Sequence, residues 1–247
     1  MRRSDMTVPM PLPLPRFSFA FQPIVQATSG TVVSYEALIR GPDGESAHSV
    51  LSRVPHGALH EFDAHGRAVA IALAARLGLC TQLNLNFLPQ SLFSQRDFLT
   101  PMLEAASRSG LPIDRLVLEV TEGEVIDDVA RFAGLIKRYR AQGLKLAIDD
   151  FGAGYCGLNL LAEFQPDVLK LDMALLRGIE RSGPRQAIVR AILSACTDLG
   201  IDAIAEGVET VDEFCWLADE GVSLFQGYLF GRPGFESLPA AVLPARG

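Results

Sequence analysis

The chain alternates between short apolar runs and longer segments in which apolar residues recur at helical spacing. The short runs are rich in Val, Ile, Leu and Phe, which is typical of strands. They predict strands at Phe17–Val25, Val32–Arg40, Gln82–Phe87, Leu116–Glu122, Lys145–Phe151, Val168–Asp172, Ala203–Gly207 and Ser223–Leu229. The helical periodicity predicts helices near residues 61–77, 97–109, 125–139, 157–164, 189–199 and 210–220.

The order of these segments predicts a (β/α)8 barrel of the TIM type, which is an α/β fold. From the second strand onward, strands alternate with helices, and 247 residues suit one barrel of about 250 residues better than an open sheet. Only the turn Thr28–Gly30 separates the first two strands. This turn is too short for a crossover helix, so the first strand must run antiparallel to the second. We expect a single domain over residues 16–247.

The start of the chain and the composition argue against a membrane-spanning protein and against a protein that binds nucleic-acid duplexes. Prolines at positions 9, 11, 13 and 15 predict that residues 1–15 are a disordered tail or a linker. No apolar run reaches the roughly 18–20 residues that span a bilayer, and the net charge of −7 argues against a surface for DNA or RNA duplexes. The four cysteines are scattered without a C-x-x-C pair, which favours reduced thiols and a cytoplasmic location.

Polar side chains lie near the carboxyl ends of the predicted strands. Barrel enzymes build their active sites at this rim, from residues of several strands. The fifth strand has two adjacent carboxylates near its end, and a glycine follows the strand, an arrangement that also caps turns and helices. Because similar endings recur on other strands, we expect one common site. Its candidates are Glu36, Asn86, Glu119, Glu122, Asp149, Asp150, Lys170, Glu206 and Gln226.

The chemistry of these side chains predicts a cation site. Neighbouring carboxylates repel one another and cost free energy to desolvate, so a positive charge is expected between them. None of the four histidines lies on these strands, and oxygen ligands without histidine select Mg²⁺ or Mn²⁺ over Zn²⁺. Asp149 and Asp150 can face one cation, or two cations that share Asp149. Two such ions are suited to phosphodiester hydrolysis.

Two short motifs match other nucleotide-binding signatures but lack their context. Gly152–Gly157 reads G-x-G-x-x-G after a strand, as in dinucleotide-binding folds. It lies in the middle of the chain, however, where Asp149 and Asp150 would face a pyrophosphate. Asp150–Gly152 spells the D-F-G of protein kinases without an H-R-D loop or a glycine loop that covers phosphates. Neither interpretation is retained.

Five motifs taken together resemble one known family. They are YEALIR at Tyr35–Arg40, LEVTE at Leu118–Glu122, DDFGAG at Asp149–Gly154, LKLD at Leu169–Asp172 and AEGVE at Ala205–Glu209. The first carries the signature of the EAL-domain cyclic di-GMP phosphodiesterases, and the likeness extends from Phe21 to Pro233. Members of that family fold as a (β/α)8 barrel with an antiparallel first strand.

The resemblance implies two Mg²⁺ or Mn²⁺ ions, with Ca²⁺ as an inhibitory substitute. One ion would be held by the positions of Glu36, Asn86, Glu119 and Asp149, and the other by those of Asp149, Asp150 and Glu206. Lys170 matches a lysine that contacts the attacking water. The implied catalytic group is therefore Lys170, Glu206 and Asp149, and the residue that accepts the proton stays open.

The same resemblance implies the supporting residues. Gln22 and Arg40 match positions in the substrate pocket, where Arg40 would contact a phosphate, and Gln226 matches a glutamine near the metal ions. Glu122 matches a glutamate that tethers the loop after the fifth strand. Glu209 matches an acid that lies behind the metal ligands.

The implied activity is hydrolysis of cyclic di-GMP to linear 5′-pGpG. Leu88 and Cys156 stand where many members have serine, but neither change removes a ligand. The alternative is a catalytically silent receptor that binds cyclic di-GMP and signals through a protein partner. The complete ligand set favours the enzyme.

Resembling proteins pair through the region after the fifth strand, which predicts a homodimer joined near residues 155–185. The short predicted helix Asn159–Phe164 is rich in large apolar residues. An isologous contact is the commonest way to bury such a patch. We expect that Leu161→Glu would weaken the dimer if Leu161 is exposed.

Overall fold

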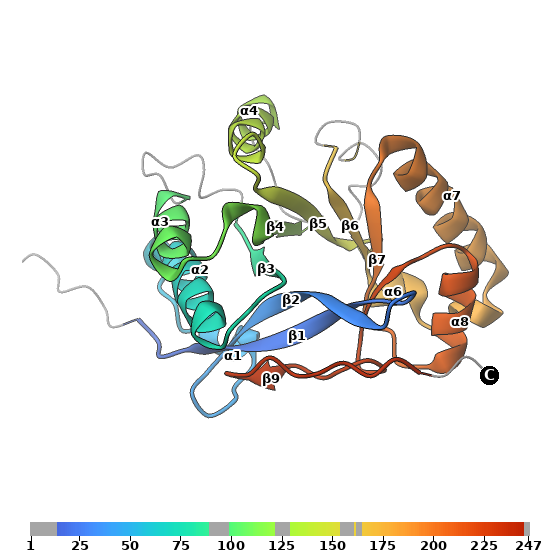
Figure 1. Ribbon diagram of the computed structural model, residues 1–247, viewed down its shortest axis with the longest axis horizontal. Coiled ribbons are helices and arrows are strands. Elements are labelled where there is room, and N and C mark those ends of the chain that lie inside the picture. The colour runs from blue at the N-terminus through green and yellow to red at the C-terminus, as the bar shows by residue number, and fades with distance from the viewer. Residues whose placement is uncertain (1–13, 89–98, 122–128, 154–160, 162–164, 245–247) are drawn as a thin grey trace, which may run out of the picture.

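The computed structural model describes residues 14–88, 99–121, 129–153, 161 and 165–244 (Figure 1). Its strands are β1 (Ser18–Gln26), β2 (Thr31–Arg40), β3 (Gln82–Asn86), β4 (Leu116–Thr121), β5 (Lys145–Phe151), β6 (Val168–Leu171), β7 (Asp202–Ala205), β8 (Leu224–Gln226) and β9 (Gly234–Phe235). Strands β2 to β8 are parallel and follow one another in chain order. β1 pairs antiparallel with both β2 and β8 and closes the barrel. The predicted barrel with an antiparallel first strand is confirmed.

Helices alternate with the parallel strands around the barrel (Figure 1). They are α1 (Ala47–Leu51), α2 (Leu59–Arg76), α3 (Thr100–Ser109), α4 (Val129–Arg140), α6 (Met173–Leu176), α7 (Gly183–Leu199) and α8 (Val211–Asp219), with 3-10 turns at His56–Ala58, Ile113–Arg115 and Ile179–Arg181. Of the helix predicted at 157–164, only Leu161 belongs to the described residues. None of the helices in the described ranges combines the length and the apolar character needed to cross a membrane.

Three short elements were not predicted from the hydrophobic pattern. α1, α6 and β9 have five, four and two residues, which is too short for a period to be recognised. β8 pairs only with Ile24–Gln26 of β1, whereas β9 pairs with Ala20 and Phe21. The segment after β8 therefore runs beside β1 and covers the part of its edge that β8 does not reach (Figure 1).

The apolar core has two large outer parts and a smaller inner part. One outer cluster packs α2, α3 and α4 against β2–β5, and the other packs α7 and α8 against β5–β8. The inner cluster fills the barrel with Ile24, Val117, Ala147, Val168 and Ile204, against which Val33 and Leu224 pack. The barrel interior is therefore a packed core and not a channel.

The inner cluster sets the position of the polar strand ends. Val117 lies two residues before Glu119, and Ala147 lies two residues before Asp149. The same spacing links Val168 to Lys170, Ile204 to Glu206 and Leu224 to Gln226. Because side chains two positions apart on a strand share one face, the polar residues point into the barrel one layer above the apolar ones. They meet at one mouth of the barrel.

Candidate active site

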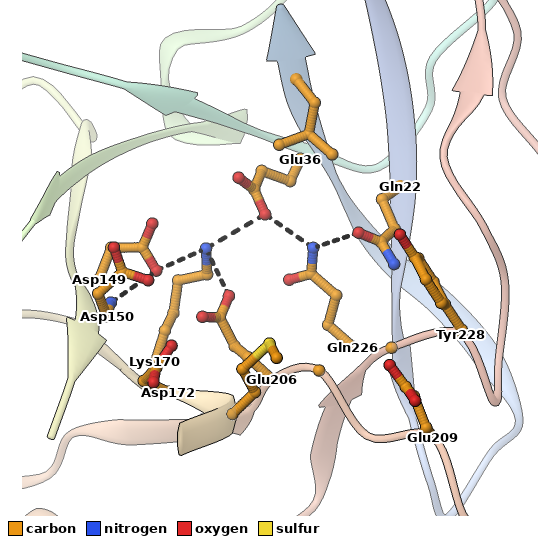
Figure 2. Close-up of a pocket in the computed structure, with 14 residues that line it drawn as sticks. Gln22, Glu36, Asp149, Asp150, Lys170, Asp172, Glu206, Glu209, Gln226 and Tyr228 are labelled. Atoms are coloured by element: carbon orange, nitrogen blue, oxygen red, sulfur yellow. Dashed lines mark hydrogen bonds and ion pairs between the residues drawn. The ribbon is translucent and has the colours of Figure 1, made fainter. Parts of the chain in front are cut away.

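A cavity of about 420 Å³ opens at the mouth where the parallel strands end (Figure 2). Its walls come from β1, β2, β5, β6 and β8 and from the segments that follow β6, β7 and β8. Among the residues that line it are the sequence-predicted Gln22, Glu36, Asp149, Asp150, Lys170, Glu206, Glu209 and Gln226. Most of the predicted site is therefore brought together in one place.

Lys170 of β6 lies at the centre of a carboxylate cluster and is fully buried. Its Nζ lies 2.7 Å from Glu206, 2.8 Å from Glu119, 3.0 Å from Asp149 and 3.3 Å from Glu36. Figure 2 shows the contacts with Glu36, Asp149 and Glu206. Burial alone would lower the pKa of Lys170, but the four carboxylates outweigh burial and raise this pKa well above its ordinary value. The lysine is therefore a permanent cation inside the barrel.

The cluster contains more carboxyl groups than ammonium groups. Within the described residues, the carboxylates of Glu36, Glu119, Asp149, Asp150 and Glu206 accompany the single ammonium of Lys170. Burial, which Lys170 offsets only in part, raises the pKa of Glu119 to about 8 and that of Glu206 well above its usual range. Burial and Asp149 raise the pKa of Asp150 to about 6. Bound cations would supply the missing positive charge.

The oxygen donors fit two divalent cations. Glu36, Glu119 and Asp149 each offer a carboxylate oxygen, and these oxygens lie within 4.8 Å of one another. Asp149, Asp150 and Glu206 form a second group of the same kind. Glu119 Oε2 is buried and has no hydrogen-bond partner within the described part of the chain. Carboxylate donors of this kind suit Mg²⁺ or Mn²⁺.

Asp149 and Asp150 reach the same cavity although they are neighbours on one strand. The pairing of β5 with β6 shifts register between Ile148 and Phe151. Asp150 has a left-handed backbone with φ of 55°, which is uncommon for a residue other than glycine. This irregularity lets both side chains line the cavity instead of pointing to opposite faces of the sheet.

Two amide side chains, those of Gln226 and Asn86, contact Glu36, and a third, that of Gln22, contacts Gln226. Gln226 Nε2 donates to Glu36 Oε2 at 2.7 Å and to Gln22 Oε1 at 3.2 Å. Gln22 Nε2 in turn donates to the Gly231 carbonyl at 3.1 Å, so the segment after β8 supports the cavity wall. Asn86 is exposed, and its Nδ2 lies 3.5 Å from Glu36 Oε1.

Some sequence-predicted residues lie away from the cavity or outside the described residues. The guanidinium of Arg40 donates to the Ile39 carbonyl at 2.8 Å, and Arg40 is not among the residues that line the cavity. Glu122 and Cys156 lie outside the described residues. Leu161 is only 2% exposed because it packs into the cluster beneath α7 and α8. The condition set for Leu161→Glu as a test of the dimer, an exposed Leu161, is therefore not met.

Sequence reasoning did not assign other residues that line the cavity. These are Leu38, Asp172, Met173, Gly207, Gly227 and Tyr228. The Asp172 carboxylate caps α6 by accepting the Ala174 N–H at 2.7 Å. Tyr228 is 49% exposed, and the Arg232 guanidinium lies 4.1 Å from the centre of its ring. The available signals were the LKLD motif and the Gln-Gly-Tyr run, which lies within the strand predicted at Ser223–Leu229, whereas the observed β8 already ends at Gln226.

Gly227 lets the chain turn from β8 into this rim. Its φ is 157°, and a Cβ at this position would collide with the backbone of Val208. Val208 and Gln226 are also joined because the Val208 N–H donates to the Gln226 carbonyl at 3.1 Å. A side chain at position 227 would therefore push apart the loops after β7 and β8.

Glu213 of α8 joins two loops beside the cavity and was not predicted. Its buried carboxylate accepts the backbone N–H groups of Gly178, Glu209 and Thr210 at 3.0, 3.1 and 3.2 Å. The Arg177 guanidinium lies 3.3 Å away. Burial opposes ionisation of Glu213, but these donors outweigh burial and lower the pKa of its carboxyl. The loops after β6 and β7 are therefore held by one charged group.

Comparison with curated proteins finds relatives along most of the chain. The blue light- and temperature-regulated antirepressor BluF of Escherichia coli (strain K12) is 37% identical over 92% of this chain and 57% of BluF. The cyclic di-GMP phosphodiesterase NbdA of Pseudomonas aeruginosa is 30% identical over 90% of this chain and 29% of NbdA. The chain thus spans less than two thirds of either protein.

Two solved structures show the same fold at higher identity. A standalone versatile EAL protein from Vibrio cholerae O395, in a c-di-GMP bound form, has a TM-score of 0.87 and 46% identity over 92% of this chain and 95% of that one. BlrP1 of Klebsiella pneumoniae, in a manganese and cy-diGMP complex, has a TM-score of 0.87 and 43% identity. The match covers 96% of this chain and 61% of the BlrP1 chain. The family model described as "EAL domain" matches residues 12–233. Because this match covers most of its length, the chain belongs to the EAL domain family.

Proposed function

We propose that the chain hydrolyses cyclic di-GMP to linear 5′-pGpG with two divalent cations bound. The observation that carries this proposal is the pair of carboxylate groups that share Asp149 beside the cavity. An acidic site can accept an anionic phosphodiester when cations offset its charge. The name of NbdA and the ligands of the BlrP1 structure support the same substrate and a divalent metal.

The residues that would hold the cations follow from the two groups. Glu36, Glu119 and Asp149, with Asn86 beside Glu36, would hold one ion, and Asp149, Asp150 and Glu206 the other. When bound, Mg²⁺ or Mn²⁺ would polarise the phosphodiester and lower the pKa of a water molecule. Ca²⁺ has larger and more flexible coordination, and we expect it to support binding of the substrate without turnover.

The chain's own groups would orient water and substrate. Lys170 is fixed by four carboxylates, so its ammonium can orient the attacking water and offset charge that develops on the phosphate. Glu206 lines the cavity beside Lys170 and can accept the proton from this water, as can Asp149. Gln22 and Gln226 would contact the substrate, and Arg40 would have to turn away from the Ile39 carbonyl to reach a phosphate.

Chromatography of reaction mixtures tests the proposal. The purified chain, cyclic di-GMP and either Mg²⁺ or Mn²⁺ should yield the linear dinucleotide, whereas Ca²⁺ or a chelator should not. Glu36→Gln should abolish turnover, and Glu104→Gln, on the outer helix α3, is the matched control. Absence of product with both metals, under conditions in which the substrate binds, would contradict hydrolysis.

BluF supplies the observation that favours a second candidate. That relative is named as an antirepressor, so a chain of this family can be a component of a protein that acts on a repressor. The alternative for this chain is a silent cyclic di-GMP receptor that signals through a protein partner. Tight binding of the nucleotide without turnover in any metal would favour the receptor.

We also propose a homodimer joined near residues 155–185, on the family resemblance. Because Leu161 is buried, Leu161→Glu would damage the core and does not test this contact. Light scattering at micromolar concentration is the direct measurement, and a fully active monomer would contradict the proposal. A cytoplasmic location stays a prediction from the scattered thiols.

A further inference from the structure

Two buried polar side chains interrupt the apolar layer below the cavity. That layer is built mainly of apolar residues from β1 and β4–β8. Ser34 of β2 and Asn84 of β3 lie on neighbouring strands and are only 4% and 2% exposed. Burying a hydroxyl and an amide costs free energy unless both are hydrogen-bonded. Apolar side chains would extend the layer without this cost, so the polar pair needs a reason.

The pair forms a directed chain of hydrogen bonds that ends on Glu119. The Ser34 hydroxyl donates to Asn84 Oδ1, and Asn84 Nδ2 donates to Glu119 Oε1 at 2.8 Å. Because the hydroxyl occupies the amide oxygen, the amide nitrogen is the atom that faces Glu119. The chain therefore crosses from β2 through β3 to β4 and presents a donor to one of the proposed cation ligands.

These contacts distinguish the two oxygens of Glu119. Oε1 receives Asn84 Nδ2 and also lies 2.8 Å from Lys170 Nζ. Oε2 is buried and has no hydrogen-bond partner within the described residues. The terminal torsion of a glutamate is broad, so Lys170 alone would leave the plane of the carboxylate loosely defined. A second donor from another strand defines it.

We infer that Asn84, held by Ser34, is a positioning residue that orients Glu119 for cation binding. Asn84 acts through Glu119 and is not among the residues that line the cavity. The inference rests on the proposed function, because it takes Glu119 as a cation ligand. Partners that stand behind a metal ligand typically contribute about 10–100-fold in metal affinity or activity.

The test is calorimetric titration of metal-free protein with Mn²⁺ in the absence of substrate. Asn84→Leu should weaken Mn²⁺ binding at the Glu119 site by about 10–100-fold. Ser34→Ala should weaken it less, because Asn84 stays but its amide is no longer held. Ile24→Val changes the same inner layer without touching the hydrogen-bond chain and should leave Mn²⁺ affinity unchanged.

Two further readouts separate positioning from a merely structural role. The double variant Ser34→Ala with Asn84→Leu removes both partners of the Ser34–Asn84 hydrogen bond, so the metal-free double variant should be at least as stable to heat as Asn84→Leu alone. In turnover assays, excess Mn²⁺ should restore kcat of Asn84→Leu while KM for cyclic di-GMP stays unchanged. A structural defect would instead lower stability and would not be restored by metal.

Each outcome decides the inference. Mn²⁺ affinities of Asn84→Leu and Ser34→Ala that equal that of the wild type would overturn the positioning role and leave the proposed function standing. A wild type that binds no Mn²⁺ would overturn both. If Asn84→Leu does not fold, the affinity of Ser34→Ala decides by the same criterion.

Discussion

Replacing Lys170 by methionine tests whether the carboxylate cluster depends on this one ammonium group. Lys170→Met keeps an apolar stem but removes a charge that lies 2.7–3.3 Å from four carboxylates. Removing one partner of a buried ion pair typically costs about 3–5 kcal/mol. In a chain of this size, 1 kcal/mol changes Tm by roughly 2–4 °C. We therefore expect the metal-free variant to melt roughly 6–20 °C below the wild type near neutral pH.

The stability difference between the wild type and Lys170→Met should also depend on pH. Glu119 has an ordinary carboxyl pKa of 4.5, and burial raises it to about 8 in the folded protein. Between these values the folded state binds more protons than the unfolded state, so stability falls as pH rises. Loss of Lys170 raises such pKa values further. The part of the stability difference between wild type and variant that comes from Glu119 should therefore grow as pH rises above about 8, where the folded variant still binds this proton and the folded wild type does not.

Thermal unfolding with and without Mn²⁺, together with turnover, is the assay. Mn²⁺ should raise the Tm of both proteins because it binds only the folded state, but turnover of the variant should stay at least about 10²-fold lower. Lys145→Met, at the opposite end of β5, is the matched control and should show neither effect. A metal-free Lys170→Met that melts with the wild type near about pH 8 would refute the reasoning.

Three other substitutions test the rest of the site. Asp149→Asn removes the charge of the carboxylate that both cation groups share and should lower turnover by at least about 10²-fold; a near wild-type rate in saturating Mn²⁺ would contradict the two-metal proposal. Glu213→Ala leaves three backbone N–H groups without their acceptor and should cost about 3 kcal/mol or more in the free energy of unfolding, measured by urea denaturation. Because the pKa of Glu213 is lowered, its contribution should shrink as pH falls through that pKa. Gly227→Ala should raise KM for cyclic di-GMP, because its Cβ collides with the Val208 backbone; unchanged kinetics would show that the loop can adjust.

The barrel could be predicted because its signals are long and regular. Strand and helix periods alternate along the chain, and the turn at Thr28–Gly30 leaves only an antiparallel pairing for β1. The mouth could be predicted because parallel strands bring their carboxyl ends together. Their positions at the ends of strands were enough to predict that Glu36, Asp149 and Lys170 lie together. No knowledge of contacts between residues distant in sequence was needed.

The remaining features depend on contacts that no local pattern carries. β9 has two residues, and its place is set by the edge of β1 that β8 leaves uncovered. Leu161 is buried because residues distant in sequence cover it. Asn84 reads as an ordinary polar residue in a strand, and its importance emerges only when Ser34 and Glu119 lie on either side of it.

The charge of the cluster links stability to cation binding in this protein. Several buried carboxylates beside one ammonium cannot all be ionised without strong repulsion. Burial and this repulsion together raise the pKa values of Glu119 and Glu206. Divalent ions would remove the repulsion, so the arrangement that weakens the metal-free fold is also the one that attracts the ions. The bulge at Asp149 and Asp150 concentrates two of these carboxylates at one point. The repulsion between these carboxylates therefore lowers the stability of the metal-free protein and raises its affinity for divalent ions. The ammonium of Lys170 offsets part of this repulsion and so limits the loss of stability.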